Sequence, residues 1–173
     1  LNDLFAALSQ AALVILAFPL YFDTLPAALI RFMEQLADRQ TAASEPARPW
    51  LLAVINCGFP ENAHNANAAA ICRHFAAESG WRWAGALSIG QGGYLDGRPI
   101  RRCGLTRRLA VALSAAVAEL AAGQPVSAAT TALFARLLMP NWLYLRAACW
   151  QWRRQAARNG TGRILKQTPY PNP

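Results

Sequence analysis

Three runs of apolar residues divide the chain, and each has the length of a β-strand. They cover residues 12–18, 50–57 and 83–89. The first two are continuous, whereas the third shows some alternation of apolar and polar positions. A continuous apolar run is typical of a strand that is covered on both faces, as in a parallel sheet. The pattern therefore predicts three strands of a buried sheet.

Segments of helical periodicity lie between and after these runs. Helices are expected over residues 2–10, 24–38, 63–79, 105–122, 127–138 and 140–159. Thr24 has the properties of an N-cap, and Gly80, Gly123 and Gly160 follow three of the helices as C-caps. Alternating strands and helices predict an α/β domain with a parallel sheet and right-handed crossovers.

The length of 173 residues suits one domain and is too short for two of ordinary size. We expect a single domain over residues 1–173, in which residues 140–173 form a C-terminal helix and tail. The chain begins at Leu1 and not at Met, so a processed, cut or fragmentary sequence is expected.

The composition excludes several classes of protein. Hydrophobic residues make up 54% and charged residues 15%, which argues against disorder. The longest apolar run, residues 11–22, contains Pro19 and is too short to span a bilayer. The four cysteines show no CxxC spacing, and no zinc signature can be assembled with the two histidines. We expect a cytoplasmic protein with no bound metal and no membrane partner.

The net charge of +8 comes almost entirely from arginine, since Lys166 is the only lysine. Such a charge is compatible with nucleic-acid binding, but also with a coding bias toward arginine and alanine. No nucleic-acid-binding motif is present, and we expect no such partner. The densest cluster would suit a phosphate of NADPH or form solvated surface charge, and consists of Arg98, Arg101, Arg102, Arg107 and Arg108.

The last predicted helix is both aromatic and basic. Its aromatic residues are Trp142, Tyr144, Trp150 and Trp152. Three interpretations are open: packing of the helix on its own sheet, an interface between subunits, or contact with a membrane surface.

Candidate chemistry lies where the strands end, because ligands of parallel sheets bind beside the carboxyl ends of the strands. The exits are residues 19–23, 57–65 and 90–94, which are rich in glycine, proline, asparagine and aromatic residues.

Four segments carry a resemblance to a known family. ILAFPLYFDTLPAALIRFMEQL, VINCGFPENAHN, IGQGG and the C-terminal MPNWLYLRAACWQWRRQAARNG with TPYPNP resemble the flavodoxin-like NAD(P)H-dependent FMN reductases. The resemblance implies a flavodoxin-like three-layer α/β/α fold with a parallel sheet. It implies FMN and NAD(P)H as cofactors, a quinone, nitro compound, metal ion or free flavin as the small-molecule electron acceptor, and a homo-oligomer.

The resemblance also assigns roles at the first two strand exits. Pro19, Leu20, Tyr21 and Phe22 would form an apolar wall beside the flavin ring, although both aromatic side chains would equally cap the core. The second exit, consisting of Asn56, Cys57, Gly58 and Phe59, would approach the polar edge of the ring. For Cys57 a small buried side chain is the alternative.

The remaining candidates follow the second and third strands. His64 and Asn65 would lie near the ring edge or cap the helix that they begin. Gly90, Gln91 and Gly92 would form a loop in which Gln91 bonds the flavin, or a plain flexible loop. No residue is expected to act as a catalytic nucleophile, acid or base, because the flavin carries the reaction.

One departure from the family pattern is large. The family begins with a strand and a Ser/Gly-rich loop that holds the FMN phosphate, and neither precedes the first helix here. No G-x-G-x-x-G or Walker-type loop occurs in the sequence. We therefore expect the first strands of the fold to be missing. The alternatives to an oxidoreductase are a non-catalytic α/β interaction module without flavin and, third, a basic nucleic-acid-binding domain.

Overall fold

The computed structural model describes residues 2–42, 48–95, 97, 99–100, 104–165 and 167. The chain divides into two compact units, Leu1–Leu138 and Met139–Pro173, and the single domain expected over residues 1–173 stays a prediction. The first unit contains α1 (Asn2–Gln10), β1 (Leu13–Pro19), α2 (Ala27–Ala42), β2 (Trp50–Asn56), α3 (Ala66–Glu78), β3 (Arg82–Ile89), α4 (Arg107–Ala121) and α5 (Ala128–Ala135). Short 3₁₀ helices in this unit are η1 (Asn62–Asn65), η2 (Gly92–Tyr94) and η4 (Gly104–Thr106).

The three strands form one parallel sheet in the order β1-β2-β3. β1 and β2 pair without a shift from Leu13 opposite Trp50 to Pro19 opposite Asn56. One irregularity between Leu51 and Leu52 separates the two halves of the β2–β3 pairing. The predicted parallel sheet is confirmed.

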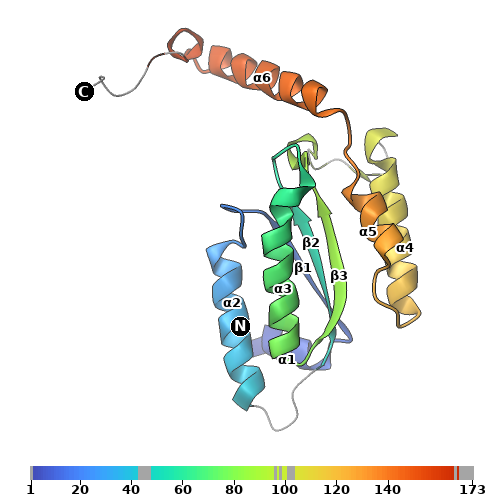
Figure 1. Ribbon diagram of the computed structural model, residues 1–173. Helices are drawn as coiled ribbons and strands as arrows, with labels where there is room; N and C mark the ends of the chain where they lie inside the picture. Colours follow the sequence, from blue (N-terminus) through green and yellow to red (C-terminus); the bar gives the residue numbers. More distant parts are fainter. Residues whose placement is uncertain are drawn as a thin grey trace. The chain divides into compact units, whose positions relative to one another are not determined.

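Helices cover both faces of the sheet. α2 and α3 lie on one face, and α4 and α5 lie on the other (Figure 1). Each face has its own core: Val14, Leu16 and Phe18 of β1 pack with residues of α1, α2 and α3. On the other face, Ala84 and Leu87 of β3 pack with residues of α4 and α5. This three-layer α/β/α arrangement is confirmed, and it is consistent with the flavodoxin-like class.

The expected cover on both faces is wrong for β1. Its burial alternates strictly, with Val14, Leu16 and Phe18 inside and Leu13 and Ile15 exposed. The physical reason is that β1 is an edge strand of the sheet. The core between the sheet and helices α4 and α5 includes no described residue of β1, so this face of the strand is left uncovered. An apolar groove of about 380 Å³ runs along this face, lined by residues that include Leu13, Ile15, Trp50, Val54, Val117 and Leu120.

Two predicted helix starts differ from the structure. α2 begins at Ala27, and the backbone N–H groups of Leu29 and Ile30 donate to the carbonyl of Pro26. Thr24 is not its cap, because its backbone closes a turn with Tyr21 instead. The helix expected over residues 63–79 consists of η1 followed by α3.

Helix ends agree better with the sequence. Gly80, Gly123 and Gly160 all have the left-handed backbone expected of C-cap glycines, with φ of 67°, 70° and 72°. Ser127 caps α5, since its hydroxyl accepts a hydrogen bond from the backbone N–H of Thr130.

The second unit contains α6 (Asn141–Arg158) and η5 (Gly162–Ile164). The backbone N–H of Thr161 donates to the carbonyl of Ala156 and folds η5 back on the end of the helix. Ala156 is the one buried residue of α6.

Candidate functional site

The three strands end side by side. Pro19, Asn56 and Ile89 occupy one row of the sheet, and hydrogen bonds continue the pairing beyond them. Leu20 N–H donates to the carbonyl of Asn56 over 2.8 Å, and Cys57 N–H donates to that of Ile89 over 3.0 Å. Parallel topology thus brings the three exit loops together, as predicted.

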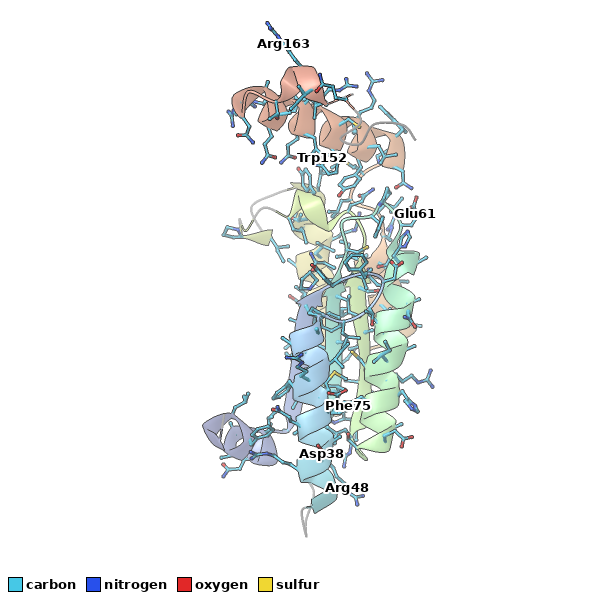
Figure 2. All side chains as sticks on the ribbon, turned by 90° about the vertical axis from the view of Figure 1, so that its left-hand side faces the viewer. Asp38, Arg48, Glu61, Phe75, Trp152 and Arg163 are labelled. Carbon is cyan, nitrogen blue, oxygen red and sulfur yellow. The ribbon has the colours of Figure 1, made fainter. Side chains whose placement is uncertain are left out.

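The exits of β2 and β3 are bound to each other. Gln91 N–H donates to the carbonyl of Phe59, and Gly92 N–H to the carbonyl of Cys57, both over 2.7 Å. Figure 2 shows Glu61 at this end of α3 and Asp38 and Arg48 at the opposite end of the unit. The two hydrogen bonds between the loops fix the backbone that carries the exposed side chains at this edge of the sheet.

Two of the predicted glycines serve this close packing. A Cβ on Gly90 would lie 2.7 Å from the carbonyl oxygen of Pro60 and 3.0 Å from the carbonyl carbon of Glu61. A Cβ on Gly92 would lie 2.8 Å from the carbonyl oxygen of Cys57. Because these atoms belong to the backbone, no side chain fits at either position without moving a loop. Both glycines are buried.

Asn65 is fully buried and connects the loop after β2 with the end of β3. Its Nδ2 donates to Asn62 Oδ1 over 2.9 Å and to the carbonyl of Ile89 over 3.1 Å, and it lies 3.5 Å from Cys57 Sγ. Its Oδ1 is buried without a hydrogen-bond partner. Asn65 occupies the N-cap position of α3, but its backbone is helical and its side chain makes no cap bond, so the side chain does not cap the helix.

Cys57 is buried beside Asn65. Its Sγ lies 3.9 Å from the carbonyl oxygen of Phe59 and 3.7 Å from that of Glu61. Burial raises the pKa of the thiol, so the uncharged form is favoured. This environment agrees with a small buried side chain and not with a reactive thiolate.

Gln91 is fully buried and has a left-handed backbone, with φ of 60°. Its Oε1 accepts a hydrogen bond of 2.9 Å from the backbone N–H of Leu138, which follows α5. Gln91 is therefore held by the packing of the unit, and its bond to the flavin stays a prediction. We call the buried set Cys57, Asn65, Gly90, Gln91 and Gly92 the floor of the site.

The exposed side chains of the edge form a second set, which we call the aromatic wall: Tyr21, Phe22, Phe59 and His64. Phe22 is 91% and Phe59 49% exposed. The alternative that Tyr21 and Phe22 cap the core is therefore wrong. Of the other predicted residues at this edge, Pro19 and Gly58 are exposed, and Leu20 and Asn56 are half-buried.

A strained turn presents Phe22. The backbone N–H groups of Tyr21 and Thr24 donate to each other's carbonyls over 2.9 and 3.0 Å. The two residues inside this turn, Phe22 and Asp23, have φ of 48° and 56°. A positive φ is rare for a bulky residue, and such strain concentrates at functional sites. The Phe22 ring meets Tyr21 edge-on at 5.3 Å.

His64 links two of the loops. Its ring stacks on Phe59 at 4.2 Å, its Nδ1 lies 3.4 Å from Asp23 Oδ1, and its Nε2 lies 4.0 Å from Glu61 Oε2. Asn67 Nδ2 also donates to the carbonyl of Asp23 over 3.2 Å. Sequence reasoning missed Asp23, Glu61 and Asn67, although the first two are acidic residues within predicted exit loops.

The predicted arginine cluster divides. Arg98, Arg101 and Arg102 lie outside the described residues. Arg107 is exposed, whereas Arg108 is half-buried and its guanidinium donates to the backbone carbonyl of Arg136. Burial and then the neighbouring Arg136 lower the pKa of Arg108, so this arginine serves the packing of α4 against the end of α5.

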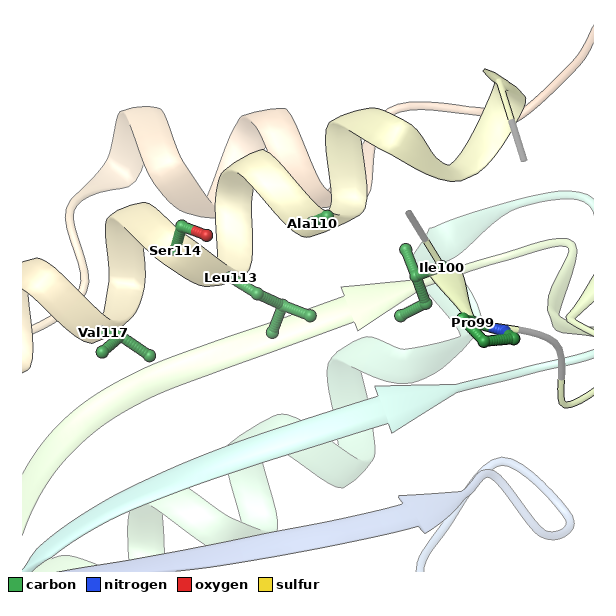
Figure 3. A pocket seen from close by; sticks show the side chains of 6 residues that line it. All are labelled: Pro99, Ile100, Ala110, Leu113, Ser114 and Val117. Carbon is green, nitrogen blue, oxygen red and sulfur yellow. The ribbon is translucent and has the colours of Figure 1, made fainter. Parts of the chain in front are cut away.

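Other features of the described residues carry no comparable chemistry. Of the described residues that line the cavity in Figure 3, about 610 Å³, Ser114 alone has a polar side chain and none is a predicted site residue. No three His, Cys, Asp or Glu side chains in the described ranges are grouped to hold a metal ion. Nor does any helix in these ranges combine the length and apolar character needed to cross a membrane.

Comparison with known proteins gives one structural likeness. No family model and no curated protein matches the chain. A solved structure of an NADPH-quinone reductase from P. pentosaceus is similar over 56% of this chain and 64% of that one, with 26% sequence identity and a TM-score of 0.46. The matched region thus spans less than two thirds of the reductase's length.

Proposed function

We propose that this chain belongs to an FMN-dependent NAD(P)H oxidoreductase and that its aromatic wall binds the flavin ring. The observation that carries the proposal is the position of Tyr21, Phe22 and Phe59, exposed together at the carboxyl edge of a parallel sheet. Exposed aromatic side chains on a hydrogen-bonded backbone are suited to a flat, partly apolar ligand.

The residues present fit the ring better than they fit the phosphate of FMN. Beside Phe59, a Cβ on Gly58 would meet nothing within 4 Å, so the backbone here is open to close approach. A helix N-terminus is the usual binding site for a phosphate. The helical segment after β2 has Glu61 at its N-cap position, and the carboxylate of Glu61 would repel a phosphate there. None of the described strand exits combines a glycine-rich turn with a free helix N-terminus.

When bound, the flavin would take up a hydride from NAD(P)H and pass electrons to a small-molecule acceptor such as a quinone, nitro compound, metal ion or free flavin. The chain itself would bind and orient the ring. His64 would form part of the surface beside the ring, because it stacks on Phe59 and Asp23 and Glu61 flank its two ring nitrogens. A homo-oligomer is part of the proposal.

The test is a titration of the chain with riboflavin and with FMN, followed by flavin fluorescence. The two should bind with affinities within about tenfold of each other, since the ring supplies most of the contact. NADH or NADPH oxidation with a soluble quinone should then depend on added flavin. If neither flavin binds, the proposal fails and a non-catalytic α/β interaction module takes its place.

A further inference from the structure

α6 exposes an unusual amount of apolar surface for a helix that also carries four arginines. Trp142, Trp150 and Trp152 are all more than half exposed, and Trp152 reaches 75%. Figure 2 shows the side chains of this helix and labels Trp152. Among the described residues of the second unit only Ala156 is buried, so this part of the chain offers no core that could receive these rings.

Part of this surface forms a continuous stripe. Its members recur at spacings of three and four residues, which places them on one side of a helix: Trp142, Leu145, Cys149 and Trp152. Arg146 and Arg153 each follow a stripe residue and therefore lie along one edge of it. A stripe of this kind needs a partner surface with an apolar interior and a charged boundary.

The charge of the second unit indicates that the partner surface is negatively charged. Residues 139–173 hold six of the 17 basic residues and none of the nine acidic ones, so they carry +6 of the net charge of +8. Two copies of α6 packed along the stripe would bring arginines together. An anionic surface is complementary, and like charge disfavours a second copy of the helix.

The apolar residues distinguish a membrane from a nucleic acid. Nucleic acids offer bases on which aromatic rings stack, but they provide little that suits aliphatic side chains. Leu143, Leu145, Ile164 and Leu165 are exposed together with the tryptophans. Tryptophan prefers the membrane–water interface, and arginine binds anionic headgroups.

We propose that α6 lies in the surface of a membrane that contains anionic lipids. The stripe would enter the boundary between headgroups and acyl chains, and the arginines would contact lipid phosphates. This proposal goes beyond the flavin function and does not depend on it. It also departs from the sequence-based expectation of no membrane partner and takes up the third interpretation of this helix, contact with a membrane surface.

The first experiment is co-sedimentation of the full chain with vesicles of phosphatidylcholine and phosphatidylglycerol, compared with phosphatidylcholine alone. Binding should require the anionic lipid and fall with salt. Replacing Arg146, Arg153, Arg154 and Arg158 by glutamine should lower the apparent affinity by roughly 1,000-fold. The matched control replaces four exposed arginines of the first unit, Arg31, Arg48, Arg73 and Arg136, and should bind within about threefold of wild type.

A second readout locates the helix at the lipid. On addition of anionic vesicles, tryptophan emission should shift to the blue in the wild type. The shift should disappear in the variant Trp142→Phe/Trp150→Phe/Trp152→Phe, which keeps the apolar surface and should still sediment with vesicles. Absence of vesicle binding, equal loss of binding in the control, or binding to RNA without binding to vesicles would overturn the proposal.

Discussion

The wall and the floor are made by the same loops, yet their side chains have opposite environments. Phe59 is about half exposed, while Cys57, two residues before it, is buried. His64 faces partly to solvent, and the adjacent Asn65 is completely covered. The floor ties the loops together through hydrogen bonds and close glycine packing, whereas the wall contributes few contacts to the core. We therefore expect changes in the floor to alter stability and changes in the wall to alter ligand binding.

The largest effect is expected for Gly90→Ala. The new Cβ would meet three backbone atoms of residues 60–62 at 2.7–3.1 Å, and relieving this overlap should cost about 3 kcal/mol of the free energy of unfolding. Urea denaturation measures the loss. Gly58→Ala is the matched control, because its Cβ meets nothing within 4 Å, and its change should stay below about 1 kcal/mol. Equal effects at the two positions would contradict the distinction.

Asn65→Ala should come next, with a loss of about 2 kcal/mol. The variant removes the donor that serves Asn62 Oδ1 and the carbonyl of Ile89 and leaves a space beside Cys57. Asn67→Ala removes an exposed hydrogen bond to Asp23 from the next turn and should cost less than about 1 kcal/mol. Thermal unfolding of both variants compares them, and a larger loss for Asn67→Ala would show that Asn65 does not hold the floor.

A small gain in stability is expected in the wall for Phe22→Gly. Glycine removes the cost of a positive φ, and the chain entropy that it adds to the unfolded state offsets part of the gain, which leaves roughly 0.5 kcal/mol. Phe22→Ala keeps the strained backbone and should show no gain. If Phe22→Gly destabilises the protein by more than about 1 kcal/mol, Phe22 belongs to the structural set.

The smallest effect concerns pH and the floor thiol. Burial raises the pKa of Cys57 above its ordinary value of 9.0, so above that pH the thiol ionises more readily in the unfolded chain. The stabilisation is complete below pH 9 and is lost as the pH rises through the folded pKa. The free energy of unfolding should therefore fall more steeply above pH 9 in the wild type than in Cys57→Ala. If the free energy of unfolding falls equally with pH in both proteins, the Cys57 thiol does not contribute to the pH dependence. Cys72, with a pKa raised to about 11, is present in both proteins and cancels in the comparison.

The sequence predicted the strands well because continuous apolar runs depend on local composition. It did not predict the bare face of β1, because cover depends on which helices reach the sheet edge. The hydrogen bonds of the floor could not be predicted from the sequence either. Asn65 bonds a carbonyl 24 residues away, and Gln91 bonds a backbone N–H 47 residues away, and no local pattern records such contacts. Asp23 and His64 follow different strands, and the pairing of β1 with β2 brings them together.

The most direct test of the separation between wall and floor is to measure riboflavin affinity and the free energy of unfolding on the double variant Tyr21→Ala/Phe59→Ala. Stacking on two aromatic rings should contribute enough that affinity falls at least roughly tenfold. The free energy of unfolding should change by less than about 1 kcal/mol, because Tyr21 is largely exposed and Phe59 about half exposed. Unchanged riboflavin affinity together with a loss of several kcal/mol would contradict the account, since the wall would then be part of the structural framework.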